Sequence, residues 1–347
     1  MKLPAETFAR LQAHYRGRAV CVTGGAGFIG GHLVDALLSL GSAITVIDDL
    51  SNSTLDHLGE LIDLEPERVR FVQGSILDDD AVGDAMENAR TVFHLAAMGS
   101  VPRSIAEPQR AWSVNATGTV RVLEAARKVK AQRVVFAASS SAYGDDPTVP
   151  KVETQMPRPM SPYAVTKLAG EHLLASWSHC YGLSTVSLRY FNIFGPRQSA
   201  DSAYAAVIAA FAKRMLLGEP PVIYGDGQQS RDFTGVANAV LATLLGGASE
   251  KPLAGEVVNV GTGRRTTLIQ LAEVMAGIIA KESSAAGMPH TYQPQFQPAR
   301  PGDVRHSLAD LGRARDLLGY SPIIGVEQAL EETITWCRQS LSGAGKP

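Results

Sequence analysis

The chain has 347 residues, of which 45% are hydrophobic and 19% charged, an ordinary composition for a globular protein with room for a sizeable core. The net charge of -2 excludes an overall electrostatic attraction to nucleic acid or to an anionic membrane. Three widely spaced cysteines, Cys21, Cys180 and Cys337, predict neither a disulfide framework nor a zinc ribbon. We expect a cytoplasmic protein, because no segment approaches the ~20 apolar residues of a membrane span or contains a signal-peptide core.

The first predicted element is a short amphipathic helix, because Phe8, Leu11 and Tyr15 recur at helical spacing. From Ala19 onward, short β-branched runs alternate with helix-length segments, which is the pattern of βαβ units and a parallel sheet. The predicted strands cover residues 19–23, 43–48, 68–74, 91–97, 133–140 and 184–191, with helices such as 28–40 and 114–129 between them. The pattern predicts an α/β, Rossmann-type doubly wound parallel sheet whose ligand binds at the carboxyl ends of the strands.

After Phe191 the alternation gives way to loops rich in glycine, proline and polar residues, which often carry specificity. Segments 236–247 and 256–262 nevertheless have the patterns of a helix and a strand that return to the first domain. We therefore expect a Rossmann domain over residues 1–190 plus 233–262 and a smaller α+β substrate domain over 191–232 plus 263–340. Residues 341–347 are expected to form a flexible tail.

A glycine-rich motif, TGGAGFIG, follows the first strand and opens the first long helix. Gly24, Gly27 and Gly30 permit a tight turn and a close backbone approach, so that a pyrophosphate can bind at the helix N-terminus. The second strand ends at Asp48, near the spacing at which a carboxylate binds a ribose diol. No arginine or lysine follows in DDLSNST, so the motif predicts NAD rather than NADP. A plain structural turn is the alternative for the glycines, and a solvated turn residue for Asp49.

A candidate catalytic pair lies in SPYAVTK, where Tyr163 and Lys167 are four residues apart and therefore on one face of a helix. A lysine ammonium and the positive nicotinamide ring of bound NAD would favour the tyrosinate and lower the pKa of Tyr163 toward neutral pH. Such a pair also arises by chance. Its interpretation rests on Ser139, Ser140 and Ser141, whose hydroxyls follow the fifth strand at its carboxyl end, although serines there are often only a polar strand exit.

The motifs TGGAGFIG, FHLAA, ASSSAYG, SPYAVTK and LRYFNIFGP stand in an order that resembles the extended short-chain dehydrogenase/reductase family, specifically its NAD-dependent sugar-nucleotide epimerases. The resemblance covers about Ala19 to Trp336. It implies that Ser139, assisted by Ser140 or Ser141, binds the sugar O4 while Tyr163 removes the O4 proton and a hydride passes from C4 to tightly bound NAD. The 4-keto sugar then rotates about its link to the diphosphate and takes the hydride back on its other face.

The resemblance also implies the remaining contacts. It places Asn115 near the active-site helix, Asn192 at the substrate diphosphate, and Arg231, Arg300 and Asp303 at the diphosphate and the uridine ribose, where a surface ion pair or a turn is the alternative. Ser75 stands where the family often has an aspartate near adenine. The implied NAD contacts are Gly24, Gly27, Phe28, Ile29, Gly30, Asp48, Asp49, Ser75, Ile76, Leu95, Ala96, Ala97, Asn115, Tyr163, Lys167 and Tyr190. The implied UDP-sugar contacts are Gly99, Ser100, Ser139, Ser140, Asn192, Gln198, Ala206, Val222, Tyr224, Arg231, Arg300, Asp303 and Ser307.

Two features bear on the sugar. Related dehydratases follow the catalytic hydroxyl with an Asp-Glu pair, whereas this chain has Ser140 and Ser141, which disfavours dehydration and glutamate-assisted decarboxylation. The pocket resembles that of epimerases acting on N-acetylated UDP-hexoses, and Ser307 stands where strict UDP-glucose epimerases have a tyrosine that would collide with an acetamido group. The alternatives are UDP-glucose or UDP-glucuronate as substrate, and a helix-capping role for Ser307. The pocket residues are Gly99, Ser140, Asn192, Gln198, Ala206 and Ser307.

The remaining expectations concern the oligomeric state, metal binding and the histidines. The family resemblance implies a homodimer through helices 114–128 and 163–180. No histidine has metal-ligand spacing with cysteines or carboxylates, so no metal is expected. We interpret His94 as a core residue and His172 and His179 as packing residues. The alternative of a non-enzymatic NAD sensor is disfavoured, because such relatives generally lose the Tyr-Lys pair.

Overall fold

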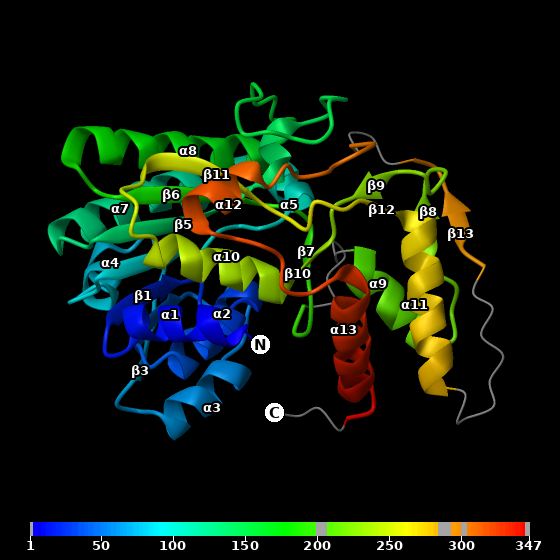
Figure 1. Ribbon diagram of the computed structural model, residues 1–347, viewed down its shortest axis with the longest axis horizontal. Helices are drawn as coiled ribbons and strands as arrows, with labels where there is room; N and C mark the ends of the chain where they lie inside the picture. Colours follow the sequence, from blue (N-terminus) through cyan, green and yellow to red (C-terminus); the bar gives the residue numbers. More distant parts are fainter. Residues whose placement is uncertain (1–2, 199–206, 284–292, 300–303, 344–347) are drawn as a thin grey trace.

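The centre of the molecule is a seven-stranded sheet in which all neighbouring strands are parallel. The computed structural model describes residues 3–198, 207–283, 293–299 and 304–343. The strand order is β11-β6-β5-β4-β1-β2-β3 (Figure 1). The strands are β1 (Ala19–Thr23), β2 (Ala43–Asp48), β3 (Val69–Gln73), β4 (Thr91–His94), β5 (Arg133–Ser139), β6 (Thr185–Tyr190) and β11 (Ala254–Val260).

The strand order confirms the predicted doubly wound sheet. The chain passes through β1, β2 and β3 toward one edge, then returns to β4 on the other side of β1 and continues through β5, β6 and β11. The order therefore reverses between β1 and β4, and the loops that leave these two strands diverge at their carboxyl ends. The strand predicted over 91–97 ends at His94, so residues 95–97 begin the loop that borders this point.

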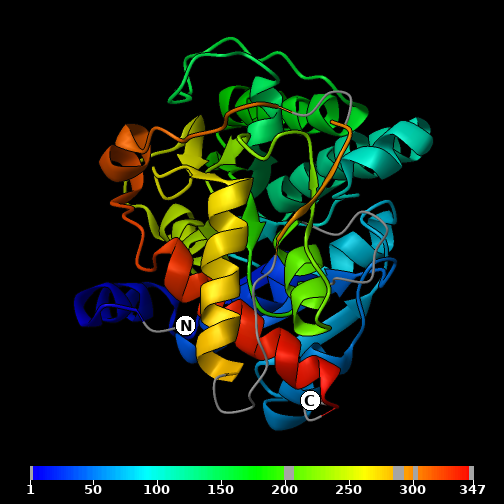
Figure 2. The same cartoon turned by 90° about the vertical axis from the view of Figure 1, so that its right-hand side faces the viewer.

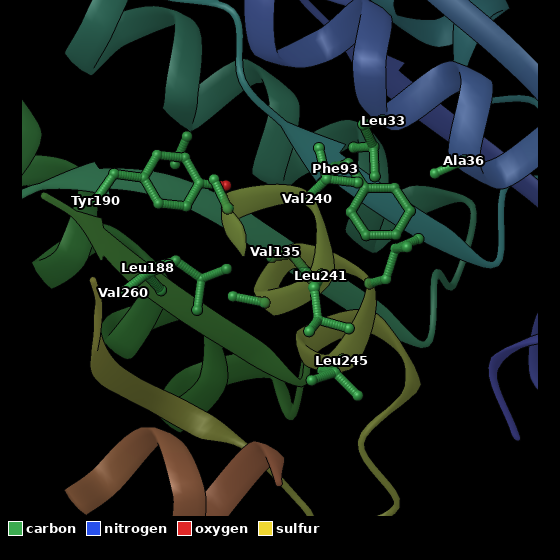
Figure 3. Packing of buried hydrophobic residues seen from close by; sticks show 14 of the residues in the cluster. Leu33, Ala36, Phe93, Val135, Leu188, Tyr190, Val240, Leu241, Leu245 and Val260 are labelled. Atoms are coloured by element: carbon green, nitrogen blue, oxygen red, sulfur yellow. The ribbon is translucent and has the colours of Figure 1, made fainter. Parts of the chain in front are cut away.

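Helices cover both faces of the sheet, so the strands are buried on both sides. On one face, α1 (Ala5–Tyr15), α2 (Phe28–Ser39), α10 (Val236–Ala248) and α12 (Gly312–Leu318) form one hydrophobic core with the sheet. On the other face lie α4 (Asp79–Ala85), α7 (Gly118–Lys128) and α8 (Pro162–Tyr181), and α3 (Asp56–Leu64) packs beside β3. Figure 3 shows the first core, with Leu33, Ala36, Val240, Leu241 and Leu245 of the helices around Phe93, Val135, Leu188 and Val260 of the strands.

The predicted N-terminal helix is confirmed as α1. Leu11 and Tyr15 are fully buried, and the Tyr15 hydroxyl donates to Leu244 O at 2.6 Å, so α1 is fixed to α10. The segment predicted as one helix over 114–129 is divided. It begins as a π-helical turn, Ser113–Thr117, after α5 (Val101–Ala106) and α6 (Pro108–Trp112), and continues as α7.

A smaller group of elements lies beside the sheet domain and has its own hydrophobic core. Figure 2 shows α11 (Leu268–Ser283, gold) and α13 (Val326–Leu341, red) in this group, with α9 (Val207–Leu216) packed against both. Three pairs of short strands complete it: β7 (Ile193–Phe194) with β10 (Thr234–Gly235), β8 (Val222–Tyr224) with β13 (Gln295–Gln297), and β9 (Ser230–Arg231) with β12 (Thr266–Thr267). Leu341, which the sequence analysis assigned to the tail, is the last residue of α13. Within the described residues, no helix combines the length and the apolarity that crossing a membrane requires.

Candidate active site

The glycine-rich turn between β1 and α2 is packed so closely that side chains are excluded from it. Gly24 has φ +73°, and a Cβ there would lie 2.6 Å from Ala96 N of the loop after β4. A Cβ at Gly30 would lie 2.1 Å from Gly24 O, so α2 begins in contact with the turn. Gly27 is the N-cap of α2, and Phe28 and Ile29 form its first turn. The predicted cofactor glycines thus bring the N-terminus of α2 to the carboxyl end of the sheet.

Asp48 lies at the end of β2 and faces this turn. Its Oδ2 accepts a hydrogen bond from Ala26 N at 3.1 Å, while its Oδ1 accepts from Leu50 N at 2.9 Å and Ser53 Oγ at 3.1 Å. These bonds hold the carboxylate beside the glycine turn, where it can accept from a ribose diol and repels a phosphate. Asp49 is exposed, and its carboxylate accepts from Ser51 N, as in a local turn.

The loop after β4 is fixed by a buried histidine. His94 lies between Thr23 Oγ1 at 2.8 Å and Thr119 Oγ1 at 2.9 Å, and burial lowers its pKa to about 3. The prediction of a core histidine is therefore confirmed. Thr23 Oγ1 also accepts from Ala96 N at 3.2 Å, which ties the partly exposed loop residues 95–97 to the glycine turn.

Two further predicted cofactor residues lie at the end of β3. The Ser75 hydroxyl accepts from Leu77 N at 3.2 Å. Ile76 is buried and packs so tightly on Gly118 that a Cβ there would lie 2.6 Å from its side chain. Ile76 thereby joins the loop after β3 to the first residue of α7.

Asn115 lies in the π-helical turn that precedes α7. Its Oδ1 accepts from Met98 N at 2.7 Å, and its Nδ2 donates to Met98 O at 3.3 Å and to Thr166 Oγ1 at 3.0 Å. Asn115 therefore joins the loop after β4 to α8, the helix of the predicted catalytic pair. The extra residue of a π-helical turn re-aims a side chain, and such turns are frequent at functional sites.

Tyr163 is placed by a well-capped helix N-terminus. Ser161 is the N-cap of α8 and accepts from Ala164 N at 3.2 Å, and Ser104 Oγ accepts from Tyr163 N at 3.0 Å. The Tyr163 side chain hydrogen-bonds Ser139. Ser139 Oγ also accepts from Ser141 N at 3.2 Å and from Ser141 Oγ at 2.9 Å. The structure thus brings together the predicted catalytic residues Tyr163, Ser139 and Ser141.

Lys167 lies one turn after Tyr163 and is almost fully buried. Its Nζ donates to Ala137 O at 2.7 Å and lies 4.8 Å from the centroid of the Phe136 ring. Burial lowers the pKa of Lys167 to about 7.

Without a cofactor, the pKa of Tyr163 lies above the ordinary value of a tyrosine. Burial raises the pKa of Tyr163, and the hydrogen bond with Ser139 opposes that rise only in part. Lys167 donates to a backbone carbonyl of β5, so its ammonium is held beside the sheet, one turn of α8 after Tyr163. The predicted lowering of this pKa by Lys167 and the nicotinamide ring together concerns the complex with NAD, and it stays a prediction.

The residues predicted for the substrate side lie largely on loops outside the seven-stranded sheet. Asn192 has φ +39° and is exposed two residues after the end of β6, and such strained residues cluster at functional sites. Gln198 Nε2 donates to Ile193 O at 3.2 Å.

Arg231 and Ser307 meet at one backbone carbonyl. Arg231 Nη1 donates to Ser230 O at 3.0 Å, and Ser307 N donates to the same carbonyl at 3.0 Å. Arg231 and Ser307, 76 positions apart in sequence numbering, are therefore neighbours. Ala206, Arg300 and Asp303 lie outside the described residues.

Asp232 organises these loops, and the sequence analysis missed it. This buried carboxylate accepts from Thr262 N at 2.8 Å, Gly263 N at 3.0 Å and Ala309 N at 3.2 Å, and burial raises its pKa. It therefore joins the loop after β11 to the segment that carries Ser307. The signal was available, because an aspartate within the apolar segment that follows Arg231 requires several donors when buried.

The remaining predicted residues lie in different surroundings. Val222 and Tyr224 are partly exposed on β8, Gly99 is exposed, and Ser100 is the N-cap of α5. Tyr190 lies apart from the loops, because its hydroxyl contacts Thr243 Oγ1 at 2.6 Å and its ring packs in the core (Figure 3).

One alternative and one expectation are wrong. The alternative of a helix-capping Ser307 fails, because α12 begins only at Gly312 and has Leu311 as its N-cap. His172 and His179 are exposed on α8 rather than packed, since their face of the helix points away from the sheet. Among the described residues, no group of three or more His, Cys, Asp or Glu side chains is arranged to hold a metal ion.

Comparisons with known proteins agree with this geometry. A family model described as the NAD dependent epimerase/dehydratase family matches residues 20–261. A UDP-glucose 4-epimerase of Mycolicibacterium smegmatis is 37% identical over 319 residues, which cover 91% of this chain and 97% of that protein.

Two solved structures share the fold over nearly their whole length. The UDP-N-acetylglucosamine 4-epimerase from Methanobrevibacter ruminantium, in complex with UDP-N-acetylmuramic acid, has a TM-score of 0.85 and 37% identity, covering 94% of this chain and 99% of that one. The UDP-glucuronic acid 4-epimerase from Bacillus cereus, in complex with UDP-glucuronic acid and NAD, has a TM-score of 0.82 and 31% identity, covering 93% and 99%. The chain therefore belongs to the NAD dependent epimerase/dehydratase family, within its NAD-dependent UDP-sugar 4-epimerases.

Proposed function

We propose that this epimerase interconverts UDP-N-acetylglucosamine and UDP-N-acetylgalactosamine through a 4-keto intermediate. The observation that carries the proposal is the position of Ser307, which is hydrogen-bonded to Ser230 O beside Arg231. A serine there leaves the space that an acetamido group needs and that a tyrosine would fill. The likeness to an epimerase of UDP-N-acetylglucosamine supports the same sugar.

Gln198 supports a polar ligand at this place. Its Oε1 is buried and has no hydrogen-bond partner among the described residues. A buried amide oxygen without a donor is unfavourable by about 1–3 kcal/mol. The N–H of an acetamido group or the O–H of a sugar hydroxyl can supply the donor, so Gln198 supports a sugar ligand without selecting among the UDP-sugars.

The residues present fit NAD as the cofactor. The turn at Gly24 and Gly30 leaves no room for a Cβ, so its backbone can approach a pyrophosphate. The Asp48 carboxylate beside that turn suits a ribose diol and disfavours a 2'-phosphate. Bound there, NAD supplies the hydride acceptor and donor.

The side chains of this chain then orient the sugar and move its proton. Ser139 Oγ accepts two hydrogen bonds from Ser141, so its own proton remains available to the sugar O4 or to Tyr163. We propose that Tyr163 removes the O4 proton and returns it after the sugar has turned over. Lys167, buried beside β5 with its pKa at about 7, holds a positive charge near the site when protonated. Arg231 and Asn192 are proposed to hold the diphosphate, about which the sugar rotates.

We also propose that the chain functions as a cytoplasmic homodimer with the domain division predicted from the sequence. Two separate hydrophobic cores support a division into two domains, but α12, which the prediction assigned to the substrate domain, packs in the core of the sheet domain. Ile105, Trp112 and Val165 are large apolar side chains that are 63%, 51% and 42% exposed around α8. Exposed apolar side chains grouped in this way favour a partner helix over water.

A substrate panel tests the proposal. Purified protein is incubated with UDP-N-acetylglucosamine, UDP-glucose and UDP-glucuronate, and kcat/KM is compared by separating the C4 isomers. We expect the acetylated sugar to be preferred, and a preference for either of the others would refute the proposal.

A Ser307→Tyr variant tests the carrying observation. We expect it to lose at least about tenfold in kcat/KM on the acetylated sugar while it retains UDP-glucose turnover. Ser307→Ala is the matched control, because it preserves the space and should keep the acetylated sugar. A Ser307→Tyr variant with full activity on that sugar contradicts the role of this serine.

A further inference from the structure

Arg189 occupies a position between the two segments that carry the catalytic groups. It lies on β6 and is 2% exposed. In the β5–β6 register, Arg189 pairs with Ala138, and the next pair is Ser139 with Tyr190. The guanidinium therefore starts one residue from the level of Ser139, on the strand that neighbours β5.

On one side, Arg189 holds the catalytic helix. Its Nε donates to Glu171 Oε1 at 2.8 Å and its Nη2 to Glu171 Oε2 at 2.7 Å. Glu171 is 3% exposed and lies on α8, four residues after Lys167 and eight after Tyr163. A bidentate pair fixes distance and orientation together, so the rotation of α8 relative to β6 is set at this contact.

On the other side, Arg189 contacts the segment that follows Ser139. Its Cζ lies 4.5 Å from the centroid of the Tyr143 ring. Tyr143 ends the 3-10 turn Ser140–Tyr143, for which Ser139 is the N-cap, and its hydroxyl donates to Asn259 Oδ1 at 2.7 Å. A stacked guanidinium thus supports the turn that positions Ser139.

We propose that Arg189 is a positioning residue that fixes the spacing between Ser139 and Tyr163 by holding Tyr143 and Glu171 at the same time. This inference rests on the proposed function only in treating Ser139 and Tyr163 as the catalytic hydroxyls. We expect the fold to tolerate removal of the whole ion pair, because apolar residues of similar volume often replace a buried pair without loss of stability. Arg189 Nη1 is buried without a hydrogen-bond partner among the described residues, which is a further unfavourable contribution that packing alone does not explain.

The test replaces the charged side chains of Glu171 and Arg189 with apolar side chains of similar volume. The double variant Glu171→Leu with Arg189→Met removes the pair without leaving an unpaired buried charge. We expect it to keep its thermal midpoint and its bound NAD, while kcat for the preferred UDP-sugar falls by roughly 10- to 100-fold with KM changed by less than about threefold. Arg189→Lys, which keeps the charge but loses the planar fork, should also lower kcat.

Arg133→Met is the matched control. Arg133 is a buried arginine at the opposite end of β5, and its Nη1 and Nη2 donate to Gly246 O and Ser249 O. We expect this variant to lose stability and to keep kcat, because it is remote from the carboxyl ends of the strands. An equal loss of kcat in Arg133→Met would overturn the proposal, since the effect would then be general to buried arginines.

A second readout does not depend on turnover. The hydrogen bond with Ser139 lowers the pKa of Tyr163, so displacing Ser139 should raise the pKa obtained from the tyrosinate absorbance of the double variant, with Tyr163→Phe as the reference. A double variant with native kcat and an unshifted Tyr163 titration overturns the positioning role. A wild type that converts no UDP-sugar refutes the proposed function, whereas the titration still decides the role of Arg189.

Discussion

Replacing Lys167 with methionine should stabilise the fold and abolish most activity. The ammonium of Lys167 is buried, and burial lowers its pKa from 10.5 to about 7. Between these two values the unfolded chain binds a proton that the folded protein does not, so stability rises with pH across this window. The unfavourable contribution of Lys167 is therefore complete below about pH 7 and is lost near pH 10.5.

The size of the effect follows from the same values. A pKa of about 7 in place of 10.5 corresponds to about 4–5 kcal/mol of the free energy of unfolding at pH 7, since one pKa unit is about 1.4 kcal/mol. The hydrogen bond to Ala137 O and the contact with the Phe136 ring offset about 2 kcal/mol of this. Lys167→Met should therefore raise the free energy of unfolding by about 2–3 kcal/mol at pH 7 and by almost nothing at pH 10.

Urea denaturation of nucleotide-free protein at both pH values measures this difference. The kcat of the variant should fall by roughly 10²- to 10⁴-fold at pH 7 and rise with pH toward the raised pKa of Tyr163. A variant that is less stable than the wild type at pH 7, or that keeps the wild-type pH profile of kcat, refutes the reasoning.

Three further substitutions test the loops of the site. Gly30→Ala places a Cβ 2.1 Å from Gly24 O and should abolish the NAD that copurifies, whereas Gly59→Ala, where a Cβ has open space, should keep it. Asp48→Asn should weaken NAD binding by roughly tenfold and improve binding of NADP, as measured by calorimetry; an unchanged ratio contradicts the ribose role. Asp232→Asn replaces an acceptor of three backbone N–H bonds and should raise the KM for the UDP-sugar by roughly tenfold, so an unchanged KM would show that these loops need no such anchor.

Local sequence patterns predicted much of the fold, because the spacing of apolar residues differs between strands and helices and can be recognised within each element. The runs at Ala19–Thr23 and Ala43–Asp48 are strands over the predicted residues, and the glycines after β1 fall where the turn excludes a Cβ. The predictions failed where the outcome depends on partners distant in sequence. The spacing of Tyr163 and Lys167 gave their common helix face, but the direction of the Lys167 ammonium depends on a carbonyl of β5.

The loops predicted to bind the substrate depend even more on contacts between segments that are distant in sequence. The local sequence of Ser307 offered a helix-capping role as an alternative, yet its backbone N–H donates to Ser230 O and α12 begins only at Gly312. Nothing near Ser307 in the sequence specifies this, because the segment is held through Asp232, whose carboxylate also binds Thr262 and Gly263. A contact among three separate loops has no periodic signature, so only the presence of a buried carboxylate could have indicated it.

These buried polar groups share an arrangement that explains how a parallel sheet holds an active site together. Loops that leave the carboxyl ends of parallel strands have no ladder to join them, and their backbone groups need partners. His94 joins β1 to α7, Asn115 joins the loop after β4 to α8, and Arg189 joins β6 to α8 and to the turn after β5. Each contact is directional, unlike apolar packing, so each fixes one loop relative to another rather than merely adding stability. Substitutions at these residues should therefore change kcat or KM more than apolar core substitutions that lower the thermal midpoint equally.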